Sequence, residues 1–278
     1  MAREHILLRY GELFLKGRNQ SFFENKLIEN LRKIAGAAKV KKVRGRLIIN
    51  YFSEHHKLRQ VFGLVSYSPA VKVEKSMEAI KQKSLELLTG KTGTFKIEPK
   101  RSDKRFPLTS PEINIELGKY IEAHTALTFD GANPQHLLGV EINQDGAYLF
   151  TEIVPCFGGL PTGVEGKVAV WIENDASILA GLLMMKRGCD VVPIGFKERD
   201  ISLLQKFSPV PLQFKAVKNL SEVEQFMPEK ELPALVVGQD FTEYKKLAFS
   251  RVVLRPLIAY TPKQVKEQLR EFEVGSAN

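Results

Sequence analysis

The segment FKIEPKRSDKRFPLTSPEINIELGKYI, from Phe95 to Ile121, carries three structural signals in order. Alternation from Phe95 to Glu98 predicts a strand, and Ser110-Pro111 predicts the start of a helix with Ser110 as its N-cap. A basic loop lies between them, followed by a helix end that offers free backbone N–H groups, which suits phosphate binding. The candidate phosphate contacts of this segment are Lys96, Lys100, Arg101, Lys104 and Arg105.

Phe106 ends the basic loop and has two possible roles. Its ring could stack on an exposed base near an RNA end. It could equally anchor the loop to the hydrophobic core. The sequence leaves both roles open.

The residues before this segment predict an α+β domain. Strand-like and helical patterns alternate as strand, helix, strand, strand, helix, strand up to Val73, which is the order of a ferredoxin-like unit. We place this domain at residues 1–75. Its candidate contacts to a phosphate backbone are Lys16, Arg18, Lys41, Lys42, Arg44 and Arg46.

Two further domains are predicted. Residues 76–166 form a second α+β unit that ends in a linker rich in glycine and proline, PCFGGLPTGVEG from Pro155 to Gly166. Residues 167–278 alternate apolar strands with helical stretches, which predicts a three-layer α/β domain with a parallel sheet.

The charge is concentrated in the first two domains. The 41 Lys and Arg exceed the 32 Asp and Glu, for a net charge of +9. Divided at Val170, the halves carry +8 and +1, and two clusters account for the excess: Leu31 to Arg59 and Lys91 to Arg105. Two basic clusters in one half favour a phosphate-binding face.

The two cysteines exclude a disulfide framework and a four-cysteine metal site, and so few cysteines are typical of a reducing cytoplasm. Cys189 is expected to be a buried apolar residue, and Cys156, in the linker, is the better candidate for a reactive thiol. The scattered histidines predict no metal site. No apolar run approaches the roughly 20 residues of a membrane helix, so a cytoplasmic protein without membrane contact is expected.

The opening segment closely resembles the THUMP domain of the tRNA 4-thiouridine synthetases, the ThiI-type tRNA sulfurtransferases. RYGELFLKGRNQSFFENKL, from Arg9 to Leu27, is similar to the N-terminal ferredoxin-like segment of that family. GGLPTGVEGK, LLMMKRG and VLRPLIAYTPKQV resemble parts of its C-terminal ATP-pyrophosphatase (PP-loop) domain. The resemblance implies tRNA binding and a homodimer.

The chain departs from the family at the phosphate-gripping loop. Family members carry SGGxDSP there, whereas this chain reads IENDASI from Ile172 to Ile178, in which only Ser177 survives. Glu173 and Asn174 stand where the family has its two glycines. Both add a Cβ to the loop, and Glu173 also adds a negative charge where a phosphate would bind. We expect ATP binding in the family's manner to be lost or very weak. The degenerate loop comprises Glu173, Asn174, Asp175, Ala176 and Ser177, and Ser177 and Cys156 are the only catalytic candidates.

The leading hypothesis is a tRNA-binding protein that does not itself adenylate tRNA and has no bound cofactor. One alternative is a working component of tRNA thiolation, with ATP and magnesium in an altered site or with a separate catalytic or sulfur-donor protein. A second alternative is a basic scaffold that binds another protein through its neutral C-terminal domain.

Overall fold

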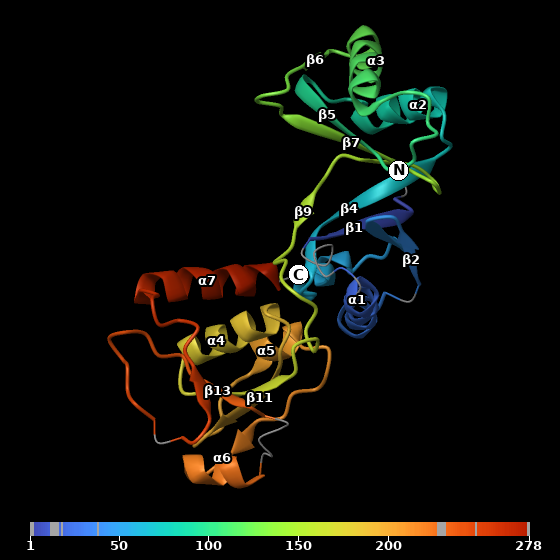
Figure 1. Ribbon diagram of the computed structural model, residues 1–278. Coiled ribbons are helices and arrows are strands. Elements are labelled where there is room, and N and C mark those ends of the chain that lie inside the picture. The colour runs from blue at the N-terminus through green and yellow to red at the C-terminus, as the bar shows by residue number, and fades with distance from the viewer. Residues whose placement is uncertain are drawn as a thin grey trace. The chain divides into compact units, whose positions relative to one another are not determined.

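Strand β5 (Gly93–Arg101), which precedes the basic loop, belongs to a large mixed sheet in the computed structural model (Figure 1). The structure describes residues 3–11, 17, 19–37, 39–226, 232–247 and 249–276. The other strands of this sheet are β1 (His5–Tyr10), β2 (Val40–Val43), β3 (Arg46–Asn50), β4 (Leu64–Val73), β6 (Leu127–Phe129), β7 (His136–Asn143), β8 (Gly146–Phe150) and β9 (Val154–Pro155). Their order is β2-β3-β1-β4-β8-β7-β5-β6, with β9 beside β4.

The first four strands have the predicted ferredoxin-like order. Along the chain, α1 (Gln20–Ala35) follows β1, and the short 3₁₀ helix η2 (His55–Gln60) follows β3. In the sheet, β1 lies between β3 and β4 and pairs antiparallel with β3, with His5 opposite Asn50. Gly36 ends α1 in the left-handed conformation at φ 71°, as its position in the sequence predicts.

Helices α2 (Met77–Leu88) and α3 (Ser110–His124) share one hydrophobic core with β5, β7 and β8. The predicted N-cap of α3, Ser110, is wrong by one residue. Thr109 has the extended backbone of a cap, and it exchanges two hydrogen bonds with Glu112 in a capping box. Ser110 therefore lies inside the helix, where Pro111 still occupies the first turn.

The chain separates into two compact units. Unit 1 comprises Met1–Arg9, Lys39–Ser53 and Ser66–Pro155, and unit 2 comprises Tyr10–Ala38, Glu54–Val65 and Cys156–Asn278. Unit 1 thus contains nearly all of the mixed sheet, together with α2 and α3. Unit 2 contains α1, η2 and the C-terminal half of the chain.

The sheet of unit 2 is parallel, as the alternation of strands and helices predicts. Its order is β12-β11-β10-β13-β14, so the chain first builds outward from β10 through β11 and then returns to the other side of β10. The strands are β10 (Lys167–Trp171), β11 (Asp190–Gly195), β12 (Lys215–Ala216), β13 (Ala234–Val236) and β14 (Val252–Leu254). The helices are α4 (Asp175–Lys186), α5 (Ser202–Phe207), α6 (Leu220–Phe226) and α7 (Pro262–Gly275).

The predicted linker is packed rather than free. Thr162 is 1% exposed, and Leu160 N–H donates to Lys186 O at 2.9 Å. A Cβ on Gly159 would lie 2.2 Å from Lys186 O, so only glycine lets the linker pass this close to the end of α4. The stretch is therefore part of unit 2. In the described part of the chain, no helix is long and apolar enough to cross a membrane.

We expect Gly118→Ala to raise the free energy of unfolding by about 0.5–1 kcal/mol, because alanine favours a helix interior over glycine. Space is available: an added Cβ would meet Ile97 and Phe129 at an ordinary 3.9 Å. The measurement is the shift in the urea midpoint. Gly139→Ala is the opposing control, since its Cβ would lie 2.1 Å from Phe150 and must destabilise the protein. A loss of stability in Gly118→Ala would contradict this assessment of the packing.

Candidate nucleic-acid interface

The two basic clusters of the sequence meet at one small pocket in unit 1. Arg44 and Arg46 come from the tight turn between β2 and β3, and Lys100 and Arg101 come from the end of β5. Glu141 and Asn143 of β7 complete the lining, and Lys100 lies opposite Glu141 in the parallel β5–β7 pair. The pocket has a volume of about 160 Å³, which suits a single phosphate group.

Glu141 forms the centre of a buried ion cluster. Its carboxylate accepts Nε of Arg9 at 3.0 Å and Nε of Arg46 at 2.8 Å, and its side chain is 8% exposed. Burial alone would raise the pKa of Glu141, but Arg46 and Arg9 outweigh that effect and hold the pKa below its ordinary value. Glu141 therefore remains charged and fully engaged.

The remaining cations of the pocket have no acidic partner among the described residues. Within the described residues, Arg44 and Lys100 have no carboxylate within 4 Å, and both are exposed. Arg101 donates from Nη1 to the carbonyl oxygen of Phe106 at 2.7 Å, which orients the guanidinium without neutralising it. The pocket thus presents three uncompensated cations beside the engaged Glu141, an arrangement that attracts a phosphate.

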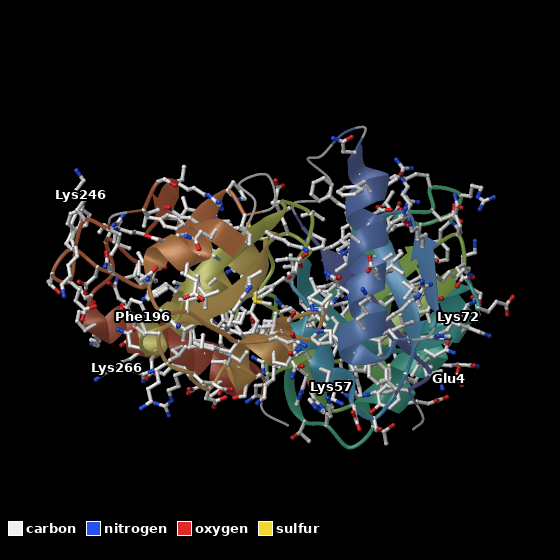
Figure 2. The ribbon with its side chains drawn as sticks, turned by 90° about the horizontal axis from the view of Figure 1, so that it is seen from below. Glu4, Lys57, Lys72, Phe196, Lys246 and Lys266 are labelled. Atoms are coloured by element: carbon white, nitrogen blue, oxygen red, sulfur yellow. The ribbon has the colours of Figure 1, made fainter. Side chains whose placement is uncertain are left out.

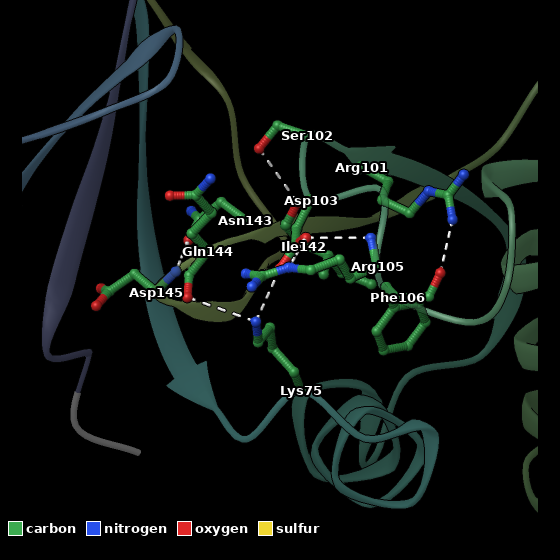
Figure 3. A network of polar contacts seen from close by, with 10 residues as sticks. All are labelled: Lys75, Arg101, Ser102, Asp103, Arg105, Phe106, Ile142, Asn143, Gln144 and Asp145. Atoms are coloured by element: carbon green, nitrogen blue, oxygen red, sulfur yellow. Dashed lines mark hydrogen bonds and ion pairs between the residues drawn. The ribbon is translucent and has the colours of Figure 1, made fainter.

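Asp103 fixes the shape of the basic loop (Figure 3). Its carboxylate accepts Nζ of Lys75 at 2.9 Å and both Nε and Nη2 of Arg105, at 3.0 and 3.1 Å. The hydrogen bonds from Arg105 and Lys75 hold the pKa of Asp103 far below its ordinary value. Ser102 N–H donates to Ile142 O at 2.9 Å, so the loop is also tied to β7.

Of the two roles open to Phe106, the structure supports the core anchor. Its side chain is 5% exposed and belongs to the core formed with α2 and α3. The ring is therefore not available to stack on a base. Its neighbour Arg105 is 75% exposed but is already bound to Asp103, whereas Lys104 is exposed.

The other predicted contacts that the structure describes do not line the pocket. Lys41 forms an ion pair with Asp145, and Lys96 forms one with Glu98 at 2.7 Å. Lys42 is exposed on β2. Lys16 and Arg18 lie outside the described residues.

The degenerate loop from Glu173 to Ser177, called the nucleotide loop below, forms hydrogen bonds with the first turn of α4 in unit 2. Asn174 caps α4 by accepting Ser177 N–H at 3.0 Å, and Glu173 N–H donates to Ser177 Oγ at 3.2 Å. A Cβ on Gly238, after β13, would lie 2.5 Å from Ser177 N, so a second segment packs directly on this helix end. The loop carries Glu173 and Asp175 and no lysine or arginine.

A larger pocket of about 600 Å³ opens beside this loop, at the carboxyl ends of β10 and β13. Trp171, Glu173 and Asn174 line one side, and Gln239 and Glu243 line another. Phe196, labelled in Figure 2, also lines this pocket and is 59% exposed. Its ring lies edge-on to that of Trp171, with 4.6 Å between the centroids. This position, where the strand order reverses, is where open α/β sheets bind ligands.

Burial works against the expected reactivity of Cys156. It raises the pKa of the Cys156 thiol to about 12, and Sγ points at Leu58 O at 3.9 Å. Burial also raises the pKa of Cys189, which is 7% exposed, as expected of a buried apolar residue. A raised pKa lowers the thiolate fraction of both cysteines at neutral pH. The described residues contain no cluster of three potential metal ligands.

Sequence reasoning missed Arg9, Glu141 and Asp103. Arg9 and Glu141 each interrupt an otherwise apolar strand, and a charge at such a position must be paired if it is buried. That signal could have singled out both residues. It could not have paired them, because 132 positions separate them.

Two family models match the chain. The ThiI ferredoxin-like domain matches residues 5–68, and the THUMP domain matches residues 74–152. A probable tRNA sulfurtransferase of Moorella thermoacetica is 32% identical over 323 residues, which cover 96% of this chain and 83% of the relative. One from Natranaerobius thermophilus is 39% identical, over 69% of this chain and 51% of the relative. The chain thus spans about half the length of several curated relatives.

Solved structures match the whole fold. The crystal structure of PH1313 from Pyrococcus horikoshii superposes with a TM-score of 0.84 at 28% identity, over 97% of this chain and 99% of that one. A 4-thiouridine synthetase in complex with RNA and ATP gives 0.79 at 27% identity, over 98% and 85%. The fold is therefore an N-terminal ferredoxin-like domain, a THUMP domain and a C-terminal α/β domain with a parallel sheet.

We expect Glu141→Gln to lower the free energy of unfolding by about 3 kcal/mol, because it leaves two buried guanidinium groups without a counter-charge. The stability that comes from the lowered pKa of Glu141 is present above about pH 4.5 and is lost as the pH falls through the folded-state pKa. Urea unfolding at several pH values should therefore show a steeper acid loss in the wild type than in the variant. Glu152→Gln is the matched control, since its partner Arg3 is exposed. Equal effects of both variants would contradict the assignment.

Proposed function

The chain belongs to the tRNA sulfurtransferase family, and we propose that it binds tRNA through the basic pocket of unit 1. The observation that carries this proposal is the meeting of Arg44 and Arg46 with Lys100 and Arg101 around a space for one phosphate. Each pair comes from a different basic cluster of the sequence. A related 4-thiouridine synthetase has been solved with bound RNA, which supports the same partner here.

Phosphate contacts dominate the affinity of proteins for nucleic acid and fix the register of the complex. The pocket supplies one fixed contact, because Glu141 and the Phe106 carbonyl orient two of its guanidinium groups. Other cations of the sequence are proposed as secondary contacts. In the described part of unit 1 they are Lys41, Lys42, Lys96, Lys104 and Arg105. Lys16 and Arg18, which lie outside the described residues, stay predictions.

We further propose that the chain does not adenylate tRNA in the family's manner. The residues at the nucleotide loop do not fit a triphosphate, because Ser177 N–H is already bound to Asn174 and Gly238 packs on the same helix turn. Glu173 and Asp175 add negative charge at this place. We therefore derive no catalytic step through ATP.

The alternative, that the chain takes part in thiolation, rests on the pocket at the carboxyl ends of β10 and β13. A pocket of this size could take a nucleotide in an altered orientation or contribute to a site shared with a separate catalytic chain. A cytoplasmic location, a homodimer and the domain divisions near residues 75 and 166 likewise stay predictions.

Replacing both free cations of the pocket, Arg44→Ala with Lys100→Ala, should weaken tRNA binding and flatten its salt dependence. Fluorescence anisotropy with transcribed tRNA at several salt concentrations measures this. The slope of log affinity against log salt should fall by about 0.7–0.9, the value for one lost phosphate contact. The control is the double variant Lys91→Ala with Lys119→Ala, which removes the same charge elsewhere in unit 1 and should keep the wild-type slope. Equal slopes in the two double variants, or no binding of wild type at low salt, would contradict the proposal.

ATP with magnesium should cause no rise in melting temperature that depends on Ser177, with or without tRNA, because a ligand raises apparent stability only if it binds the folded state. Differential scanning fluorimetry with millimolar ATP tests this. An upward shift that disappears in Ser177→Ala would instead support the thiolation alternative and place ATP at the loop.

A further inference from the structure

A pocket at the other end of α4 gathers three separate stretches of unit 2. Gly159 and Leu160 come from the packed linker, Lys186 and Arg187 from the end of α4, and Tyr260 from the segment before α7. Its volume is about 500 Å³. Because α4 has 12 residues, this pocket lies about 18 Å along the helix from the nucleotide loop. It is a separate site.

Two cations of this pocket lack acidic partners, and one lining glutamine has an unpaired amide oxygen. Among the described residues, neither Lys186 nor Arg187 has a carboxylate within 4 Å. Gln268 of α7 also lines the pocket, and its Oε1 atom is buried with no hydrogen-bond partner in the structure. A buried acceptor left unpaired costs roughly 1–3 kcal/mol, so a donor that reaches it stabilises the complex.

The two cations are not needed to close the helix. Basic side chains at a helix end often donate hydrogen bonds to the last four carbonyl groups. Here backbone N–H groups bind all four of these carbonyl groups. Arg187 N–H donates to the carbonyl oxygens of Leu183 and Met184, and Gly188 N–H donates to that of Met185. Leu160 N–H, from the linker, donates to that of Lys186. The side chains of Lys186 and Arg187 are therefore free to bind a ligand.

We propose that this pocket binds a nucleoside monophosphate. Lys186 and Arg187 supply the charge that recognises the phosphate. Tyr260 and Met184 supply an aromatic and a thioether surface for a planar base, and Gln268 Oε1 accepts a base N–H. The volume is within the usual range for a ligand of this size.

Isothermal titration of the full chain with AMP, CMP and inorganic phosphate tests the site. The wild-type chain should bind both nucleotides saturably. Arg187→Ala should weaken the affinity for both about tenfold to a hundredfold, which is the effect of one lost charged hydrogen bond. Gln268→Leu should weaken the nucleotides but not inorganic phosphate. Lys266→Ala, an exposed cation of α7 (Figure 2), is the matched control and should bind like wild type.

Circular dichroism and melting of each variant establish that the fold is intact. No saturable binding of AMP or CMP at millimolar concentration would overturn the proposal, as would equal losses in Arg187→Ala and Lys266→Ala. Loss of AMP binding in Ser177→Ala, with Arg187→Ala unaffected, would place the ligand at the nucleotide loop and overturn it as well. Weaker tRNA binding in Arg187→Ala with unchanged AMP binding would mean an RNA contact instead.

Discussion

A buried carboxylate with two arginines holds the basic face of unit 1 together. Glu141 on β7 binds Arg9 on β1 and Arg46 on β3, although β4 and β8 lie between β1 and β7 in the sheet. Removing ions from water is costly, so such a cluster is stable only when every partner is present. The arginine of β1 also lies over the Phe150 ring at 4.8 Å, and that ring covers Gly139 of β7. The acidic residue of the pocket is thus directed inward, and its basic neighbours face solvent.

Elements with strong local patterns could be predicted, and side-chain partners could not. The order of the first strands and the parallel sheet of unit 2 match those expected from the periodicity of the sequence. Both basic clusters could be recognised in the sequence. That Arg46 and Lys100 line the same pocket could not be predicted, because their proximity depends on the register of β5 with β7. Phe106 and Cys156 show the same limit. Their chemistry depends on burial, and burial is set by segments far along the chain.

The two ends of α4 in unit 2 differ in which groups are free to bind a ligand. The parallel sheet retains the strand order that places a site at its carboxyl edge, while the loop that would grip a phosphate binds its own backbone. At the opposite end of α4, backbone donors close the helix and leave two cations unused. The ligand of the unit therefore cannot be argued from the strand order. It has to be argued from the side chains at each end of the helix.

Hydrogen bonds between distant segments of unit 2 delay its folding during synthesis. Asn30 of α1 donates to Thr162 O, a partner 132 residues later, and Gln60 donates to Ser276 O, 216 residues later. During synthesis, α1 leaves the ribosome long before these partners exist, with the apolar face of Phe23, Leu27 and Leu31 uncovered. Unit 2 can close only after α7 has been synthesised. Such distant contacts slow folding, and they leave the apolar face of α1 open to aggregation until α7 emerges.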